Sequence, residues 1–447
     1  MWTSKQQVMH RLAQTNRVLY VEEPVTMLAP LKVPARWRRW RALAPRLERV
    51  SAGLWTLTPP PLLPFGNMRP GVNDVNQAVL AMYVRWAVRR LRFDDGYILW
   101  SYLPTVLPLL DRLGARPGDG SGAQRSGESL SGGSSSSRDA AGIESAGTKG
   151  LAAVDREGLR LGREVGSGLM GPRGGRLPTP SLVVYHCVDE HSAFPGFVDP
   201  AVVHGYDDQL TRRADLVITT SENLRAARLP LNPHTYTVFN AADVEIFGRA
   251  LEPELMVPAD MASIPEPRLG VVGLHDSRLD VDALEALAEA DPRWHIVLIG
   301  PIKQGQVDEA RLRRHPNIHL LGERPRPELP AYLKGMAVAL IPYKANELTR
   351  NIFPLKLFEY LAAGLPVVAG GLPELRRFTG VIGLPSSPSD YVEEVRKALA
   401  EDEPDKRAAR VALAAENTWD HRVAQISALV EEGLDRVAGT SMHGGET

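Results

Sequence analysis

Short, continuous apolar runs recur along the chain and predict buried strands. They lie at residues 17–21, 53–57, 97–100, 181–185, 216–219 and 236–239 in the first half, and at residues 269–272, 295–299, 318–321, 338–341 and 366–369 in the second. A strand buried on both faces needs such a continuous run, whereas a strand with one wet face alternates. The pattern therefore predicts parallel sheets covered by helices on both faces, which is the α/β fold class.

Helical periodicity fills the stretches between these runs. One apolar stripe spans residues 281–288, and Asp280 stands where an N-cap is expected. A chain of 447 residues is too long for one ordinary core, so two domains are expected. We place the domains at residues 1–250 and 268–415, with a proline-rich linker at residues 251–267 and a closing helix at residues 416–440.

One segment departs from this pattern. Residues 117–180 are rich in Gly and Ser, including the run SGGSSSS at residues 131–137. Such a composition buries too little apolar surface to offset the entropy of ordering. We predict a disordered insertion in a surface loop between the strands at 97–100 and 181–185. It is either a regulatory loop or a tolerated insert, since loop length itself costs little.

Composition narrows the function classes. The formal net charge of −1 gives no global attraction to nucleic acid, which we do not expect as a partner. The one cysteine, Cys187, allows no intrachain disulfide and fits a reducing compartment. No apolar run reaches the length of a membrane-spanning helix, and the first residues carry no signal-peptide core. We therefore expect a cytoplasmic protein.

Residues 341–366 carry the clearest chemical signal. A polar loop follows a strand, and a helix then begins near Pro354 and ends at Gly364. Ligands of open parallel sheets bind beyond the carboxyl ends of the strands, where this loop and the helix N-terminus are expected. Lys356 and Glu359 stand three residues apart and share one side of the helix. A lysine there neutralises phosphate, and a carboxylate there accepts hydrogen bonds from the hydroxyls of a ribose.

This segment resembles the donor-binding motif of retaining glycosyltransferases of family 4, which have the GT-B fold of two Rossmann-like domains facing across a cleft. In that motif a Glu, seven residues and a second Glu are followed by a small-residue helix, a Gly and a Pro-Val-Val strand. Glu359 matches the second Glu, which holds the ribose in the family, while Asn351 stands at the first, which touches the donor sugar. The pattern Pro-x-Lys-x-x-Glu-Tyr is closer to transferases of the teichuronic-acid type, which build cell-surface glycans.

Other segments carry the same resemblance over most of the chain outside the insertion. Residues 270–280 resemble the first strand and turn of the donor domain, which places Gly273 at the turn and makes Arg278 a candidate for binding the diphosphate. Arg350, beside Asn351, completes the donor-binding candidates. Further similar segments are residues 214–221, a strand ending in Ser; residues 239–247, an interdomain element; residues 322–333, where the family seats the base; and Trp419 with Arg422 in the closing helix.

The acceptor half is defined by fewer residues. His186, Asp189 and Glu190 follow the strand at 181–185 and are expected to line the cleft. Related enzymes carry a His or Asp at this place, so the resemblance makes these three the catalytic candidates, which would orient donor or acceptor hydroxyls. The alternative is that His186 is a satisfied core residue. Cys187 has no partner motif and is expected to be packed.

A basic segment near the start has interleaved tryptophans. Its residues are Arg36, Trp37, Arg38, Arg39, Trp40 and Arg41. Tryptophan favours the membrane interface and arginine favours anionic headgroups, so peripheral contact with the inner membrane face is one interpretation. A solvated helix face is the other. The resemblance makes the first plausible, because many transferases of this class act on lipid-linked acceptors, and both interpretations stay open.

The resemblance implies retaining transfer of a sugar from a nucleoside diphosphate sugar to a glycan or lipid-linked acceptor. It implies no cofactor and no metal, because a helix dipole and basic residues stabilise the leaving diphosphate. No Asp-x-Asp metal motif stands in a suitable loop. Two other classes remain open: a sugar-nucleotide epimerase with the same fold, and a protein that binds sugar nucleotides without turnover.

The start of the chain leaves one question about the first sheet. In related proteins a strand precedes the loop and helix that the first residues resemble, and the strand like residues 18–21 comes second. Without it, neighbouring strands would keep unpaired backbone groups at roughly 1–3 kcal/mol each. We expect either that the native start lies upstream or that the N-terminal domain is marginally stable. The alternative is that the strand at residues 18–21 takes the central place.

Overall fold

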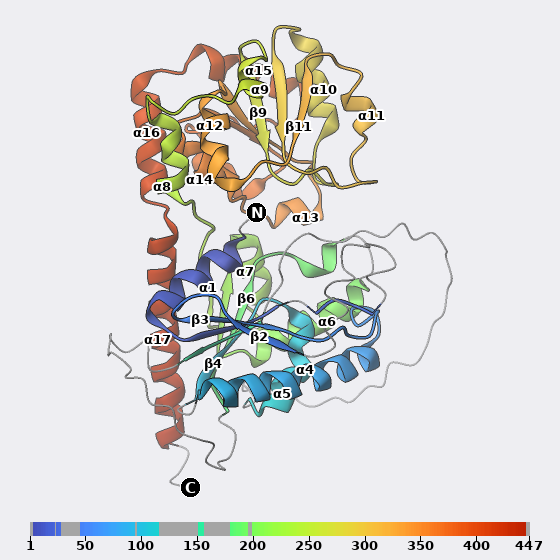
Figure 1. Cartoon of the computed structure of the whole chain (residues 1–447), viewed down its shortest axis with the longest axis vertical. Helices are drawn as coiled ribbons and strands as arrows, with labels where there is room; N and C mark the ends of the chain where they lie inside the picture. Colours follow the sequence, from blue (N-terminus) through green and yellow to red (C-terminus); the bar gives the residue numbers. More distant parts are fainter. Residues whose placement is uncertain are drawn as a thin grey trace. The chain divides into compact units, whose positions relative to one another are not determined.

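Figure 1 shows the computed structural model, in which residues 3–22, 24–27, 45–93, 96–115, 151–155, 179–194 and 199–443 are described. The chain divides into two compact units. The N-terminal unit comprises Lys5–Thr219, Leu224–Val238 and Val423–Thr447, and the C-terminal unit comprises Met1–Ser4, Thr220–Asn223 and Phe239–Arg422. Each unit is built around one β-sheet.

The sheet of the N-terminal unit has eight strands in the order β2-β3-β1-β5-β4-β6-β7-β8. Its neighbours pair in parallel except where β2 or β5 is one of the pair, because these two strands run antiparallel. The strands are β1 (Val18–Val21), β2 (Arg46–Arg49), β3 (Leu54–Thr58), β4 (Tyr97–Ser101), β5 (Leu151–Asp155), β6 (Pro180–Cys187), β7 (Leu216–Thr219) and β8 (Thr235–Thr237).

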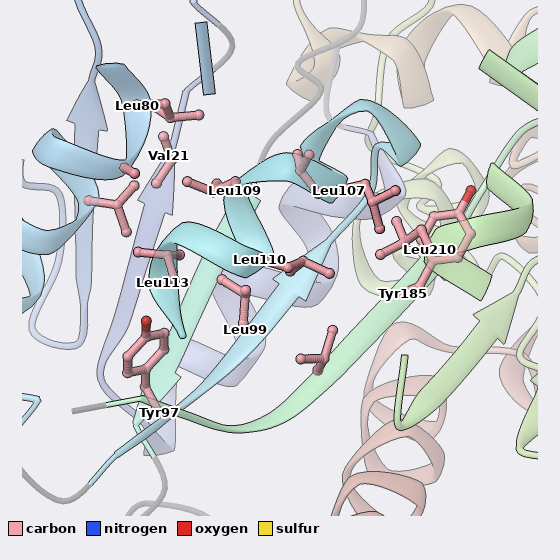
Figure 2. Packing of buried hydrophobic residues seen from close by; sticks show 14 of the residues in the cluster. Val21, Leu80, Tyr97, Leu99, Leu107, Leu109, Leu110, Leu113, Tyr185 and Leu210 are labelled. Atoms are coloured by element: carbon pink, nitrogen blue, oxygen red, sulfur yellow. The ribbon is translucent and has the colours of Figure 1, made fainter. Parts of the chain in front are cut away.

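One face of this sheet packs against α4 (Pro70–Leu91), α5 (Leu107–Leu113) and α6 (Pro200–Arg213). Figure 2 shows Leu99 of β4 and Tyr185 of β6 in this core, with Leu80 from α4 and Leu110 from α5 among them. The strand residues of this core are odd-numbered, as the period of two in a strand requires. The odd-numbered side chains of the strands therefore face this core, and the even-numbered ones face the opposite side of the sheet.

The opposite face of the sheet meets α1 (Ser4–Thr15) and α17 (Trp419–His443). Lys5 of α1 lies over the ring of Tyr102, and a Cβ on Gly433 of α17 would stand 3.3 Å from the side chain of Leu182. The remaining helix is α7 (Glu222–Arg228), with single 3-10 turns at η2 (Pro104–Val106) and η4 (His191–Ala193). Both faces of the sheet are thus covered by helices.

The sheet of the C-terminal unit has five strands, all parallel, in the order β11-β10-β9-β12-β13. They are β9 (Arg268–Val272), β10 (His295–Ile299), β11 (Ile318–Gly322), β12 (Val338–Pro342) and β13 (Val367–Gly370). The chain builds outward from β9 first to one side and then to the other. A sheet of this order binds ligands beyond the carboxyl ends of its strands, at the point where the order reverses.

Helices cover both faces of this sheet as well. The longer ones are α10 (Val281–Ala290), α15 (Pro388–Ala400) and α16 (Pro404–Ala415), and α10 and α15 share one apolar core with β9, β10 and β12. Shorter helical segments are α8 (Val244–Gly248), η5 (Arg249–Leu251), α9 (Ala259–Ala262), α11 (Glu309–Leu312), η6 (Arg326–Glu328), α12 (Leu329–Lys334), α13 (Glu347–Arg350), α14 (Lys356–Ala362) and η7 (Pro373–Phe378).

The strands and helix ends that the sequence predicts are confirmed where the structure describes them. Each of the predicted apolar runs lies in a strand, with ends shifted by a residue or two. Asp280 caps α10, since its carboxylate accepts from the backbone N–H of Ala283 at 3.2 Å. Gly364 follows α14 with φ +75°, the left-handed conformation expected of a glycine beyond a helix end.

The prediction of a wholly disordered insertion is wrong for one stretch. Leu151–Asp155 form β5, which pairs antiparallel with β1 on one side and with β4 on the other. Only the composition around this stretch argued for disorder, whereas its own sequence, LAAVD, is apolar enough to pair in a sheet. The rest of the predicted insertion lies outside the described residues, apart from its last two.

β5 also pairs with β1, the strand beside which the sequence analysis expected a neighbour to be missing. Each of the four residues of β1 has a partner in β3 and another in β5, so the predicted row of unpaired backbone groups is absent from this strand. The N-terminal sheet fills the place next to β1 with a strand from much later in the chain. β2 was not predicted because its sequence RLER is polar and largely exposed at the edge of the sheet.

Candidate functional site

A small pocket opens at the carboxyl ends of β9 and β12 in the C-terminal unit. His275, Tyr343, Lys356 and Tyr360 are among its lining residues. The pocket stands at the place where a sheet of this strand order binds its ligand. It therefore marks the candidate functional site of this unit.

Two glycines lie at the turns after β9 and β10, at positions that exclude a side chain. Gly273 follows β9 with φ +144°, and Gly300 follows β10 with φ +141°. A Cβ on Gly300 would stand 1.7 Å from the carbonyl oxygen of Gly273, so the two turns meet backbone to backbone. A Cβ on Gly273 would lie 3.6 Å from Cε of Lys356. The candidate Gly273 thus lies beside the candidate lysine.

Lys356 and Glu359 form the charged centre of the site. Nζ of Lys356 donates to Oε2 of Glu359 at 2.6 Å, and about one tenth of either side chain is exposed. Both residues lie in the first turn of α14. The helix is fixed to the sheet by Tyr360, whose hydroxyl accepts from the backbone N–H of Val272 at 2.8 Å. The two side chains that the sequence analysis paired are therefore in contact, at a mostly buried position.

Arg278 stands near the same pocket but already has a carboxylate partner. Its guanidinium donates to Asp276 at 2.8 and 2.7 Å, and it lies 5.3 Å from the centre of the Tyr343 ring. The backbone N–H of Lys344 donates to the carbonyl of Arg278, which ties this turn to the segment after β12. Arg278 is thus placed at the site, with its charge balanced by Asp276.

Arg350 is the last residue of α13 and Asn351 follows it; α13 is a short helix where the sequence predicts a polar loop. Asn346 and Thr349 form a reciprocal capping box at its start, which is a local reason for the helix. The Asn351 amide donates to the carbonyl of Glu347 at 3.0 Å, while the Arg350 side chain is exposed. Neither side chain is recorded among those lining the pocket. Their donor-binding roles stay predictions.

His275 is a site residue that the sequence analysis missed. It is buried, and burial lowers its pKa to about 4, so the imidazole is neutral at pH 7. Its Nε2 has no hydrogen-bond partner among the described residues. A single His two residues after a Gly carries no recognisable pattern in the sequence. Its position at the end of β9 was the one available signal.

In the N-terminal unit, His186 lies in a buried cluster with Trp100 and Tyr102. The His186 ring centre is 5.0 Å from that of Tyr102 and 5.9 Å from that of Trp100. Burial, with the charge of Lys5, lowers the pKa of His186 to about 3. Among the described residues His186 Nδ1 has no hydrogen-bond partner, whereas the polar atoms of Trp100 and Tyr102 are close enough to interact with each other. A buried ring nitrogen without a partner is unusual.

Glu190 belongs to a different, ion-paired cluster. Arg228 is buried and its guanidinium reaches Asp207 at 2.7 Å and Glu190 at 3.4 Å. Glu190 also accepts from the hydroxyl of Ser192 at 2.6 Å. Asp189 is half-buried, and its carbonyl accepts from the Cys187 thiol at 3.3 Å. The structure thus separates Glu190, held by Arg228, from the cluster around His186; the catalytic roles of all three residues stay predictions.

The part of the chain that the structure describes holds neither a metal-binding cluster nor a membrane-spanning helix. No group of three or more His, Cys, Asp or Glu side chains there is arranged to hold a metal ion. None of the helices in those ranges is long and apolar enough to span a membrane. The basic segment 36–41 lies outside the described residues.

Residues 267–401 match the family model described as glycosyl transferases group 1. The match lies within the C-terminal unit, so these residues are similar to the group 1 glycosyltransferases. The matched residues include Gly273, Arg278, Lys356 and Glu359, and the pocket is lined entirely from within them. The donor-side candidates therefore all fall inside the matched segment.

Relatives of known name or structure extend this similarity. A Bacillus subtilis (strain 168) protein named as a glycosyltransferase of teichuronic acid biosynthesis, TuaH, is 28% identical over 213 residues, which is 45% of this chain and 52% of that protein. The chain thus spans about half of the length of this relative. A trehalose-6-phosphate synthase, OtsA, superposes with a TM-score of 0.59 at 12% identity and covers 96% of this chain and 95% of its own. The α,α-trehalose 6-phosphate synthase of Burkholderia multivorans gives 0.57 at 14% identity, with 89% and 88% covered.

These superpositions cover both units and show the fold. The predicted class, α/β with two Rossmann-like domains of the GT-B type, is confirmed. Identities of 12 and 14% carry the fold alone. They do not transfer the substrates of those synthases.

Proposed function

We propose that this protein transfers a sugar from a nucleoside diphosphate sugar to a glycan or lipid-linked acceptor, with retention of the anomeric configuration. The observation that carries the proposal is the Lys356–Glu359 pair, whose lysine lines the pocket beyond β9 and β12. Both residues lie within the segment that matches the group 1 glycosyltransferases. Similarity to a protein named for teichuronic acid biosynthesis supports a role in the synthesis of a cell-surface polysaccharide.

Lys356 and Glu359 have the chemistry that a nucleoside diphosphate needs. The ammonium of Lys356 neutralises phosphate, and the carboxylate of Glu359 accepts from the two hydroxyls of a ribose. Without a ligand the two groups satisfy each other at 2.6 Å. Binding exchanges this single contact for one contact to phosphate and two to the ribose. The bare backbone at Gly273 leaves the space beside Lys356 open to the ligand.

The leaving group would be stabilised without a metal or a cofactor. As the diphosphate departs, negative charge grows next to Lys356 and the first turn of α14. Arg278 would supply a second cation if the diphosphate displaces Asp276 from its guanidinium. The neutral His275 is able to donate or accept a hydrogen bond without adding charge. Retention of configuration is proposed from the resemblance to the retaining group.

The acceptor side is proposed to lie at the cluster around His186. Trp100 and Tyr102 offer donors there, and the neutral imidazole has one unpaired nitrogen. A sugar presents hydroxyls that both donate and accept, which matches such a set. The protein is proposed to act in the cytoplasm at the inner membrane face, where lipid-linked acceptors are exposed.

A turnover assay separates this function from its two rivals. Each nucleotide sugar that raises the unfolding temperature is incubated with the protein, with and without acceptor glycans. A transferase releases nucleoside diphosphate and forms a product whose first-formed anomer, seen by NMR, keeps the donor configuration. An epimerase changes the sugar with no acceptor present, and a silent binding protein changes nothing. Inversion at the anomeric carbon would refute the retaining assignment alone.

A substitution at Lys356 tests the binding geometry. Lys356→Ala should weaken nucleoside diphosphate more than the free nucleoside, because only the diphosphate meets the ammonium. Lys397→Ala, an exposed lysine in α15 of the same unit, is the matched control. Equal losses for both ligands would show that Lys356 does not lie at the phosphates.

A further inference from the structure

The outer face of α4 carries apolar side chains that the fold does not use. The inner face of the helix buries Leu80, Val84 and Val88. On the outer face Val75 is 50% exposed, Met82 60% and Trp86 43%. Seven and four residues separate these three positions, so they form one stripe along the helix. Large apolar residues rarely gather in this way on a soluble face without a partner.

Arginines border this apolar stripe. Arg85 and Arg89 lie along one side of it and Arg90 along the other, at the spacing that 100° per residue gives. All three are exposed, and no ion pair is recorded for any of them among the described residues. Asp74, the one acidic residue within α4, is paired with Arg112 at 2.8 Å. The outer face of α4 is therefore apolar along its centre and positive at its edges.

We propose that this outer face, defined by Val75, Met82, Trp86, Arg89 and Arg90, docks onto an anionic lipid surface. A helix lying in the plane of a membrane inserts its apolar stripe at the level of the headgroups, while arginines meet anionic lipids on either side. Tryptophan is suited to that level because its ring is apolar and its N–H is polar. α4 packs on α5 and β1, and the exposure of Val75, Met82 and Trp86 places this face away from that packing.

Charge decides between a lipid surface and the other occupants. A second copy of this chain across a twofold axis would offer these arginines no unpaired acid on α4, since Asp74 is already paired with Arg112. Nucleic acid would match the arginines, but Val75 and Met82 offer no ring on which a base stacks. An anionic membrane matches both the charge and the aliphatic side chains. The inference rests on the proposed action at the inner membrane face but not on the transferase chemistry, and it concerns residues other than the basic segment 36–41.

Vesicle binding by the full-length protein tests the proposal. The protein is sedimented with vesicles of phosphatidylcholine alone and of phosphatidylcholine mixed with phosphatidylglycerol. We expect binding to the mixed vesicles, weakened by added salt because part of the attraction is Coulombic. Met82→Ser with Trp86→Ser should lower the partition coefficient about tenfold or more by removing the apolar insertion. Arg89→Gln with Arg90→Gln should lower it about fivefold for each arginine.

Matched controls come from exposed positions in the C-terminal unit. Leu251→Ser with Met256→Ser removes two exposed apolar residues, and Arg313→Gln with Arg314→Gln removes two exposed arginines. Both controls should bind vesicles as the parent protein does. Unfolding temperatures of all variants, measured without lipid, should match because each altered side chain is exposed.

Three outcomes would overturn the proposal. The first is vesicle binding that the α4 substitutions leave unchanged, including binding lost only on substitution within residues 36–41. The second is a dimer in lipid-free solution that Met82→Ser with Trp86→Ser dissociates. The third is nucleic-acid binding that the α4 variants remove while vesicle binding stays at the control level. No readout involves donor or acceptor, so failure here and failure of the transferase assignment are distinguishable.

Discussion

The two sheets of this protein differ in the direction of the strands near their centre. The C-terminal sheet is all parallel around β9, and its pocket lies at the ends of β9 and its neighbour β12. The N-terminal sheet admits an antiparallel strand, β5, between β1 and β4. The C-terminal unit, which holds the donor-side candidates, thus keeps the all-parallel strand order in which ligands bind beyond the strand ends. The sheet of the N-terminal unit depends instead on β5, a segment far from β1 in the sequence.

The largest effect should follow removal of β5. Deleting residues 151–155 leaves backbone groups of β1 and β4 unpaired, at roughly 1–3 kcal/mol for each buried group, so several kcal/mol in total. Hydrogen exchange should then accelerate at β1 and β4 and stay slow at β9 and β10. Deleting residues 118–149 instead keeps β5 and serves as the control. Unchanged protection at β1 and β4 without residues 151–155 would show that β5 does not support the sheet.

Ion pairs give the next comparison between the units. Arg228 and Asp207 of the N-terminal unit pair at 2.7 Å with both side chains buried, whereas Arg293 of the C-terminal unit pairs with Asp291 at 2.7 Å while 83% exposed. Arg228→Ala should lower the free energy of unfolding by about 3–5 kcal/mol, because it leaves the buried carboxylate of Asp207 without a cation and with the Tyr185 hydroxyl as its remaining side-chain partner. Arg293→Ala should cost about 0–1 kcal/mol. Urea denaturation of both variants measures the two values, and equal losses would contradict the contrast.

A buried histidine in each unit should make both units sensitive to acid. The pKa of His186 is about 3 and that of His275 about 4, both below the ordinary value of 6.5. The unfolded chain therefore binds a proton below pH 6.5 that the folded chain refuses, so stability is present above that pH and falls as pH falls. From pH 7 to pH 5 each histidine should account for about 2 kcal/mol of lost stability.

Single substitutions assign this loss to the two units. His186→Gln should flatten the pH dependence of hydrogen exchange at β6, and His275→Gln should flatten that at β9. The comparison is made within each variant between pH 7 and pH 5, which removes any constant effect of the substitution. A variant that keeps the full acid sensitivity of its unit would show that its histidine is not buried neutral.

The sequence predicted the strands of the C-terminal unit and its Lys356–Glu359 pair, for a physical reason, but neither the short helix α13 nor His275 at the pocket. Its strands are buried on both faces and read as continuous apolar runs, and Asp280 and Gly364 mark helix ends by their own chemistry. Lys356 and Glu359 were found because a fixed spacing in one helix sets their contact. Local pattern and local structure coincide in this unit.

The features missed by the sequence analysis depend on contacts between distant segments. β5 joins residues of β1 and β4 far from it in the chain, and no local pattern states which strand it will meet. The cluster of His186 with Lys5, Trp100 and Tyr102 likewise gathers three elements and the residue after β4. Pairing of Glu190 with Arg228 was also invisible, since a carboxylate after a strand looks the same whether it meets a substrate or an arginine.

The central claim is that the C-terminal unit binds a nucleoside diphosphate through Lys356 and Glu359, and calorimetric titration tests it most directly. UDP and GDP are titrated against the parent protein, Glu359→Gln and the control Glu393→Gln, an exposed glutamate of α15. For whichever nucleotide binds the parent, Glu359→Gln should weaken binding by roughly 1–3 kcal/mol, the range for hydrogen bonds to a charged group, and the control should not. Affinity for that nucleotide unchanged by Glu359→Gln would contradict the claim.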